Sequence, residues 1–375
     1  MRIAIIAKLY APIRTTSSMG QEKFVYNLAC LLAKKGHDVT LFAAPGSRVE
    51  GVKVISLIKE SFWTEQNRKH KKEDDLNPVM NYCAGINEIE GYNKILFYLR
   101  KHKNDFDVIH DNSDKMAIIA NAKFLVDLPL VSTLHVPPDY LHRLNKIIGE
   151  KELNNYYVSI SKKQRKLAKN VKIFDVVYNG IDVTKFTFSA KSLSYLAWIG
   201  RVVPSKGLGA AMEIAEKTKT KLRIAGPIQN QQYFDKDIKP RLGKNIKYLG
   251  PLSGRKLIRF YKKAKALLFP IRWEEPFGLV MAEAMACGTP IIAFRRGSVP
   301  ELVVQNKTGY ICPRDKTASM IKAVKKIYAL SDEKYLEIRK NCRQHVEAKF
   351  TLDKMEENYV EVYSKAILDW KQKKS

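Results

Sequence analysis

The sequence lacks the features expected of a secreted, zinc-binding or membrane-spanning protein. Its cysteines are odd in number and scattered without a C-x-x-C pair, which argues against a disulfide framework or a zinc site and fits a reducing compartment. The apolar run at the N-terminus, MRIAIIAKLYAP, is too short for a signal peptide, and no segment is long enough to span a bilayer. We therefore expect a cytoplasmic protein. The five cysteines are Cys30, Cys83, Cys287, Cys312 and Cys342.

Acidic residues are also scarce relative to basic ones. The 375 residues include 38 Asp and Glu against 66 Lys and Arg, which gives a formal net charge of +28. Residues 1–187 carry +9 and residues 188–375 carry +19. Such an excess indicates phosphate-bearing partners, whether a nucleotide, a nucleic acid or an anionic membrane face. Lysines that decorate solvated helix faces would explain it equally well, so charge alone leaves the partner open.

Several motifs that would point to other functions are missing or misplaced. No G-x-G-x-x-G follows a predicted strand, which argues against a dinucleotide-dependent oxidoreductase. No recognised nucleic-acid-binding motif is present, and the aromatic residues are not interleaved with the basic runs. Asp235-Lys236-Asp237 matches the Asp-x-Asp of metal-dependent transferases, but it lies in a charged, helix-like stretch rather than at a strand end. We expect no metal, no bound cofactor and no nucleic-acid partner.

The sequence does contain a recurring order of short apolar strands and amphipathic helices. RIAIIA (2–7), DVTLFAA (38–44) and PLVSTLH (129–135) are nearly continuous apolar runs, typical of buried parallel strands. The order restarts at YLAWIGR (195–201) and continues to TGYICP (308–313). This pattern predicts an α/β protein built from doubly wound, Rossmann-like sheets.

The length of the chain suits two domains of similar size. We place an N-terminal Rossmann-like domain at residues 1–187 and a C-terminal Rossmann-like domain at residues 188–351. The charged segment 352–375 is predicted to be a helix that packs back on the N-terminal domain.

One stretch of the second domain, EEPFGLVMAEAMACGTPIIAF (274–294), indicates a ligand site. Ligands of doubly wound sheets bind at the carboxyl ends of strands, and Glu275 follows a predicted strand there. Pro276 favours a helix start, so the N–H groups of Phe277 to Val280 are predicted to form a phosphate cradle. Glu283 lies in the body of this helix, and two carboxylates so placed could accept hydroxyls on either side of a diphosphate.

Other strand ends carry further candidates. The loop that contains Gly200, Arg201 and Lys206 follows a strand, and its cations could neutralise a diphosphate. In the first domain, a helix begins at Gly20 and His135 stands at a strand end; a single histidine is more often structural than catalytic. Asp111 and Asp114, in HDNSD, follow another strand and are weaker candidates, for binding the acceptor.

These segments together resemble the retaining glycosyltransferases of family 4, which have the GT-B fold. The resemblance covers nearly the whole chain, through FDVIHDNSD, STLHVPPD, VYNGIDVTKF, IGRVVPSKG and FPIRWEEPFGLVMAEAMACGTP. It implies two Rossmann-like domains facing across a cleft, with an acceptor side in the N-terminal domain and a nucleotide-sugar site in the C-terminal domain. It also implies metal-independent transfer of a hexose by front-face attack.

The resemblance further implies roles for individual residues. Glu283 would bind the ribose, Arg201 and Lys206 would hold the diphosphate, and His135 would contact the sugar near the reacting carbon. Glu275 would hold the donor hexose together with Pro276 and the backbone of Phe277, Gly278 and Leu279. Gly20 and Gly200 would let the backbone approach the donor. The family usually has two glycines at the first of these loops, whereas Met19 precedes Gly20 here.

The substrates are less constrained than the class. The donor is expected to be a UDP-glucose-like nucleotide sugar, and the acceptor a small molecule, a glycan or a lipid. KKQRKLAK (162–169) is either a basic helix face that contacts an anionic membrane or a solvated face. The alternative function is a basic protein on an α/β scaffold that binds nucleic acid or an anionic membrane without sugar transfer.

Overall fold

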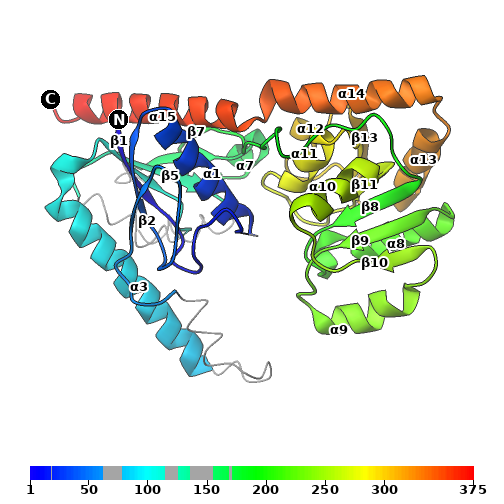
Figure 1. Cartoon of the computed structure of the whole chain (residues 1–375), viewed down its shortest axis with the longest axis horizontal. Helices are drawn as coiled ribbons and strands as arrows, with labels where there is room; N and C mark the ends of the chain where they lie inside the picture. Colours follow the sequence, from blue (N-terminus) through cyan, green and yellow to red (C-terminus); the bar gives the residue numbers. More distant parts are fainter. Residues whose placement is uncertain (18, 62–77, 115–125, 136–154, 169–170) are drawn as a thin grey trace. The chain divides into compact units, whose positions relative to one another are not determined.

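The computed structural model describes residues 1–17, 19–61, 78–114, 126–135, 155–168 and 171–375. The chain divides into two compact units (Figure 1). The first unit comprises Met1–Ile160, Gln164–Tyr178 and Leu352–Ser375, and the second comprises Ser161–Lys163 and Asn179–Thr351.

The division after residue 178 lies earlier than the 187/188 boundary expected from the sequence. Hydrogen bonds attach the intervening segment to the second unit, because Arg343 donates to the carbonyls of Val183 and Phe186 at 3.0 and 2.7 Å. The backbone of Ile181 also pairs with Thr351. The apolar strand pattern could not reveal these contacts, since they join loop carbonyls to an arginine far along the chain.

The first unit is built on a parallel sheet with strand order β3-β2-β1-β4-β5-β6-β7. Strands β1, β2 and β5 lie within the apolar runs predicted at residues 2–7, 38–44 and 129–135. The order reverses between β1 and β4, which is the position where doubly wound sheets bind ligands. The strands are β1 (Arg2–Ile6), β2 (Asp38–Phe42), β3 (Lys53–Ile55), β4 (Val108–Asp111), β5 (Leu130–Leu134), β6 (Tyr156–Ser159) and β7 (Ile173–Val176).

Helices α1 and α15 pack together on this sheet and share one apolar core. Phe24 and Leu28 of α1 lie in the same buried cluster as Met355, Tyr359 and Tyr363 of α15. The C-terminal segment is therefore part of the first unit. The helical segments here are α1 (Gly20–Lys34), α3 (Pro78–Lys101), η1 (Lys103–Asp105), α7 (Lys162–Leu167), which spans the division, and α15 (Leu352–Gln372).

The second unit has its own parallel sheet, with strand order β10-β9-β8-β11-β12-β13. Its strands are β8 (Tyr195–Ile199), β9 (Lys221–Ala225), β10 (Ile246–Tyr248), β11 (Ala266–Phe269), β12 (Ile291–Phe294) and β13 (Gly309–Cys312). Its helical segments are η2 (Pro204–Lys206), α8 (Leu208–Lys217), α9 (Gln231–Tyr233), η3 (Phe234–Ile238), η4 (Lys239–Arg241), α10 (Gly254–Lys263), α11 (Leu279–Ala286), α12 (Val299–Leu302), α13 (Thr317–Tyr328) and α14 (Asp332–Lys349).

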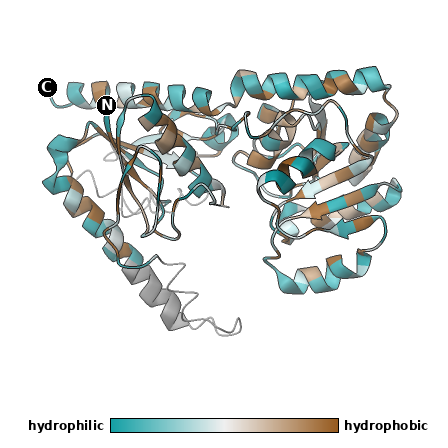
Figure 2. Ribbon diagram, in the orientation of Figure 1, coloured by the Kyte–Doolittle hydropathy of each residue, from teal (hydrophilic) through white to brown (hydrophobic). Residues whose placement is uncertain are grey.

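Helix α14 is mostly hydrophilic along its length (Figure 2), yet it contributes a fully buried arginine. The guanidinium of Arg339 donates to the carbonyls of Ser189 and Lys262 at 2.8 and 3.0 Å, and also to those of Ala264 and Cys287. Buried charge is tolerated where every donor is satisfied, and Arg339 thereby joins three separate segments of the second unit to α14. In the described part of the chain, no helix has the length and apolar character needed to cross a bilayer.

Candidate active site

Two loops at the carboxyl ends of β8 and β11 bring the main predicted residues of the second unit together. The strands are neighbours in the sheet, so the segments that follow them leave from the same edge. The ammonium of Lys206 donates to the Glu275 carboxylate with an Nζ–Oε2 distance of 2.7 Å. Both side chains are mostly buried, at 17% and 14% exposed, and the Lys206 ammonium also lies 4.6 Å from the centre of the Trp273 ring.

Two glycines allow this close approach of the backbones. Gly207 has a φ of +75°, and a Cβ atom there would lie 1.9 Å from the carbonyl oxygen of Pro270. Gly297 has a φ of +51°, and its Cβ atom would lie 2.1 Å from the carbonyl oxygen of Glu275. Any side chain at either position would move the segment that carries Glu275, because a backbone oxygen cannot yield as a flexible side chain can.

The neighbouring carboxylate, Glu274, has a different environment from Glu275. It accepts a hydrogen bond from the N–H of Gly297 at 2.8 Å and pairs with Arg314 at 2.9 Å. Glu274 therefore fixes the loop, while Glu275 is directed to Lys206. The sequence analysis assigned no role to Glu274, although Glu274 directly precedes Glu275 in the sequence.

Helix α11 begins later than Pro276 suggested. Gly278 is the residue before the helix and adopts a left-handed conformation with φ +81°, so the helical turn starts at Leu279. Phe277 and Gly278 therefore precede the helix, and only Leu279 and Val280 of the predicted cradle lie in its first turn. The side chain of Phe277 is 1% exposed and packs edge-on against Phe350 at 5.8 Å, so it anchors the loop.

Glu283 lies inside α11 and is held from the neighbouring helix. Its side chain is 7% exposed, and its Oε2 atom accepts a hydrogen bond from the hydroxyl of Tyr261 at 2.8 Å. Burial raises the pKa of Tyr261 well above its ordinary value, so the phenol stays a donor. The carboxylate is thus positioned one turn into the helix that follows Glu275, as the spacing of the two glutamates predicted.

Arg201 stands apart from this ion pair. It follows β8, after Gly200, but its guanidinium Nη1 donates to the side-chain oxygen of Gln229 at 2.7 Å. The structure thus joins Lys206 to Glu275 and leaves Arg201 exposed on the same edge of the sheet. Asp235 and Asp237 lie on η3 as exposed residues, with Asp235 bonded to Gln231 at 2.9 Å.

In the first unit, Asp111, Asp114 and His135 lie at or just after the carboxyl ends of β4 and β5, strands that pair side by side. The Nε2 atom of His135 is 2.9 Å from the side-chain oxygen of Asn112, and the His135 ring packs edge-on against Phe24 at 4.7 Å. Burial lowers the pKa of His135 to about 4, so the imidazole is neutral near pH 7. With Nε2–H donating to Asn112, the other ring nitrogen is left as an acceptor.

The two aspartates of HDNSD differ in accessibility. Asp111 is 2% exposed and accepts the N–H of Ser113 at 2.8 Å, and burial raises its pKa to about 6. It supports the loop from inside and cannot touch an acceptor as it stands. Asp114 pairs with Lys8 at 2.7 Å. Gly20 is the first residue of α1, and Met19 before it is 42% exposed.

Two buried groups near these loops were not found from the sequence. His110 bonds Thr133 through Nε2 and Tyr363 through Nδ1, both at 2.7 Å, and Thr133 also meets Tyr359 at 2.9 Å. This network ties α15 to the sheet. Glu22, in the first turn of α1, is only 3% exposed, and burial raises its pKa. The sequence signal that could have indicated Glu22 is its position two residues after Gly20, at the start of the predicted helix.

Comparison with known proteins identifies the chain. Residues 19–185 match the model of the family described as Glycosyltransferase Family 4, and residues 185–345 match Glycosyl transferases group 1. The chain belongs to the family 4 glycosyltransferases. It is a transferase with the GT-B fold, which favours sugar transfer over the alternative of a protein that only binds nucleic acid or membrane.

The relatives described next differ from this glycosyltransferase at most sequence positions. It is 27% identical to glycogen synthase from Mycobacterium tuberculosis, over 87% of this chain and 86% of the relative. D-inositol 3-phosphate glycosyltransferase from Mycolicibacterium smegmatis is 23% identical, over 82% of this chain and 79% of the relative. Among solved structures, sucrose-phosphate synthase from Thermosynechococcus elongatus gives a TM-score of 0.77 at 18% identity, covering 98% and 99% of the two chains. HepE from Anabaena, solved with UDP-glucose, gives 0.69 at 16% identity over 97% and 100%.

Proposed function

We propose that this glycosyltransferase transfers a hexose from a UDP-sugar, with UDP-glucose as first candidate, to an acceptor hydroxyl with retention of anomeric configuration. The observation that carries the proposal is the 2.7 Å pair between Lys206 and Glu275 at the carboxyl edge of the second sheet. This pair supports the proposal, because a leaving diphosphate needs a cation and sugar hydroxyls need a carboxylate acceptor. The structural similarity to HepE, which was solved with UDP-glucose, supports the choice of donor.

In the proposed reaction, the bond between the anomeric carbon and the diphosphate oxygen breaks while the acceptor oxygen attacks from the same face. The acceptor proton moves to the departing diphosphate oxygen, and the nucleoside diphosphate leaves. Negative charge builds on the diphosphate, and Lys206, Arg201 and the first turn of α11 stabilise it electrostatically without a metal ion. No covalent nucleophile is assigned.

The remaining roles in the proposal are those implied by the family resemblance. When the donor binds, hydroxyls of its hexose donate to the Glu275 carboxylate in place of the Lys206 ammonium. Glu283, oriented by Tyr261, accepts the ribose hydroxyls. His135, neutral near pH 7 and oriented by Asn112, contacts the sugar beside the reacting carbon. Gly20 and Gly200 give the donor access to backbone atoms, and the protein acts in the cytoplasm.

Mass spectrometry of the protein incubated with separate nucleotide sugars tests this proposal. UDP-glucose should bind and be consumed in preference to GDP-mannose and UDP-N-acetylglucosamine. Consumption of a GDP-sugar alone would overturn the donor assignment, and failure to bind any nucleotide sugar would overturn the proposed site. Lys256→Gln, a substitution of an exposed lysine on α10, serves as a control that should behave as the wild type.

A further inference from the structure

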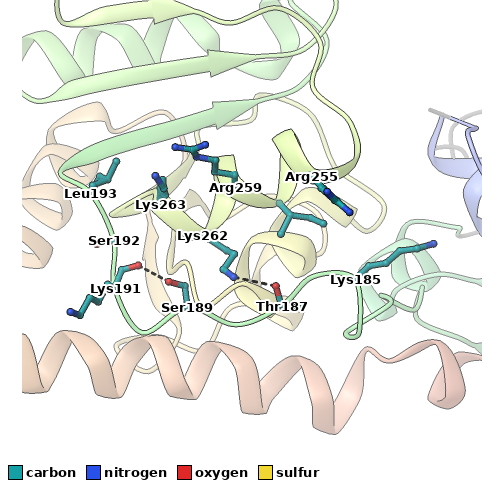
Figure 3. Close-up of a pocket in the computed structure, with 11 residues that line it drawn as sticks. Lys185, Thr187, Ser189, Lys191, Ser192, Leu193, Arg255, Arg259, Lys262 and Lys263 are labelled. Atoms are coloured by element: carbon teal, nitrogen blue, oxygen red, sulfur yellow. Dashed lines mark hydrogen bonds between the residues drawn. The ribbon is translucent and has the colours of Figure 1, made fainter.

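A second concave site lies in the second unit, between α10 and the segment 185–193 (Figure 3). The pocket has a volume of about 560 Å³, within the range of small-molecule sites in proteins. None of the described residues that line it is acidic. Its cationic side chains are Lys185, Lys191, Arg255, Arg259, Lys262 and Lys263.

Most of these cations lack a carboxylate partner. Lys185 lies 3.7 Å from Asp182. In the described part of the chain, no carboxylate oxygen lies within 4.0 Å of a charged nitrogen of the other five pocket cations, so none of the five forms an ion pair there. Lys262 donates to the hydroxyl of Thr187 at 3.2 Å, a neutral partner that leaves its charge in place. The pocket therefore concentrates positive charge that the protein does not neutralise.

The arrangement of charges on α10 disfavours the helix by itself. Arg255 and Arg259 are four residues apart, as are Arg259 and Lys263, and like charges at this spacing repel one another. Arg255 also lies in the first turn, where the helix dipole favours acidic groups and α10 has none. Only Lys262 and Lys263, in the last turn, complement the dipole. A bound anion would offset this repulsion.

Hydrogen bonds hold the two walls of the pocket in place without a ligand. The N–H of Leu193 donates to the carbonyl of Lys263 at 2.7 Å. The buried Arg339 guanidinium joins the carbonyls of Ser189 and Lys262, one from each wall. Since these bonds fix the backbone from which the cations project, little order has to be gained when a ligand binds.

We propose that this pocket binds a ligand with two or more phosphate groups. Arginine forks and lysine ammonium groups together suit phosphate oxygens, and cations line the pocket on both walls. The pocket is distinct from the Lys206–Glu275 site, because Leu193 precedes the amino end of β8 whereas Lys206 follows its carboxyl end. The phosphates come either from a free polyphosphate-type molecule or from the headgroups of an acidic phospholipid layer.

Isothermal titration with inorganic tripolyphosphate tests the site. The pocket variant Arg259→Gln/Lys262→Gln should bind tripolyphosphate at least tenfold more weakly than the wild type. The matched variant Lys322→Gln/Lys325→Gln removes two exposed lysines of α13 and should stay within about twofold, as expected if local geometry rather than net charge determines binding. The same difference between wild type and pocket variant should persist when both proteins also carry Arg201→Gln, which separates this site from the donor loop.

Vesicle flotation then identifies the source of the phosphates. Flotation with phosphatidylglycerol but not phosphatidylcholine vesicles, lost in the pocket variant and competed by tripolyphosphate, would assign a lipid headgroup. Tripolyphosphate binding without flotation would assign a free ligand. The proposal is overturned if the pocket variant binds tripolyphosphate as tightly as the wild type, or if the α13 variant weakens binding equally. Circular dichroism of each variant confirms that it is folded.

Discussion

Replacing Lys206 by methionine removes one charge at the proposed diphosphate site while keeping an apolar stem beside Trp273. The Lys206 ammonium is 2.7 Å from Glu275 and 4.6 Å from the centre of the Trp273 ring, with only 17% of the side chain exposed. If this cation stabilises the leaving diphosphate, its loss should resemble the loss of one oxyanion donor. We expect turnover to fall about 10²- to 10³-fold, or about 2.7–4 kcal/mol of transition-state stabilisation.

The same substitution leaves Glu275 without its partner, so a stability effect must be separated from the catalytic one. A largely buried group that loses a hydrogen bond costs about 1–3 kcal/mol, which corresponds to a melting temperature lower by several degrees. The double variant Lys206→Met/Glu275→Gln should recover much of this stability, because the remaining side chain is neutral. Its turnover should stay low.

The assay measures release of UDP from UDP-glucose per folded molecule, alongside thermal unfolding of each variant. Donor affinity should fall less than turnover, because the leaving-group charge is largest in the transition state. Near-normal turnover in Lys206→Met, at any stability, would refute the assignment of Lys206 to the diphosphate. Recovery of turnover in the double variant would show that the loss came from the unpaired Glu275 instead.

Three further predictions test other parts of the account. Glu283→Gln should weaken UDP binding by about 1.5–3 kcal/mol in calorimetry, and Tyr261→Phe should weaken it less, because Tyr261 only orients the carboxylate; unchanged affinity in Glu283→Gln would remove the ribose role. Sugar transfer should persist in EDTA, whereas loss of activity that manganese restores would direct attention to Asp235 and Asp237. Burial lowers the pKa of His110 to about 3, so its contribution to stability is complete above pH 6.5 and should decline by about 1.4 kcal/mol per pH unit as the pH falls from 6.5 toward 3. In chemical unfolding, the free energy of unfolding of His110→Gln should therefore depend less steeply on pH than that of the wild type. An equal slope in the two proteins would contradict the assignment of this pH dependence to His110.

The positions of the strands along the chain were predictable because parallel strands buried on both faces are continuous apolar runs, as in Ile3–Ile6 and Leu267–Phe269. Their order within each sheet was not predicted, because it depends on which distant segments pair. The spacing of Glu275 and Glu283 likewise predicted one carboxylate before a helix and one inside it. The start of α11 was not predictable from Pro276, because the left-handed backbone at Gly278 delays the helix.

Features that depend on contacts between distant segments were beyond sequence reasoning. Arg339 belongs to a mostly charged helix and would be expected on the surface, yet it is fully buried among carbonyls from several segments. His110 follows the pattern of an ordinary strand residue, and its partners Tyr359 and Tyr363 come from the end of the chain. The ion pair between Lys206 and Glu275 forms because β8 and β11 are neighbours in the sheet, and the sequence alone does not show which strands are neighbours.

Proton NMR of the wild-type protein mixed with UDP-glucose in EDTA tests the central claim most directly. The spectrum follows consumption of the donor and the configuration of the first sugar product, whether it forms on an added acceptor or on water. The account predicts release of UDP and initial appearance of the α-anomer, since attack and departure share one face of the sugar. Initial appearance of the β-anomer would contradict it. So would a protein that consumes another nucleotide sugar but leaves UDP-glucose unchanged.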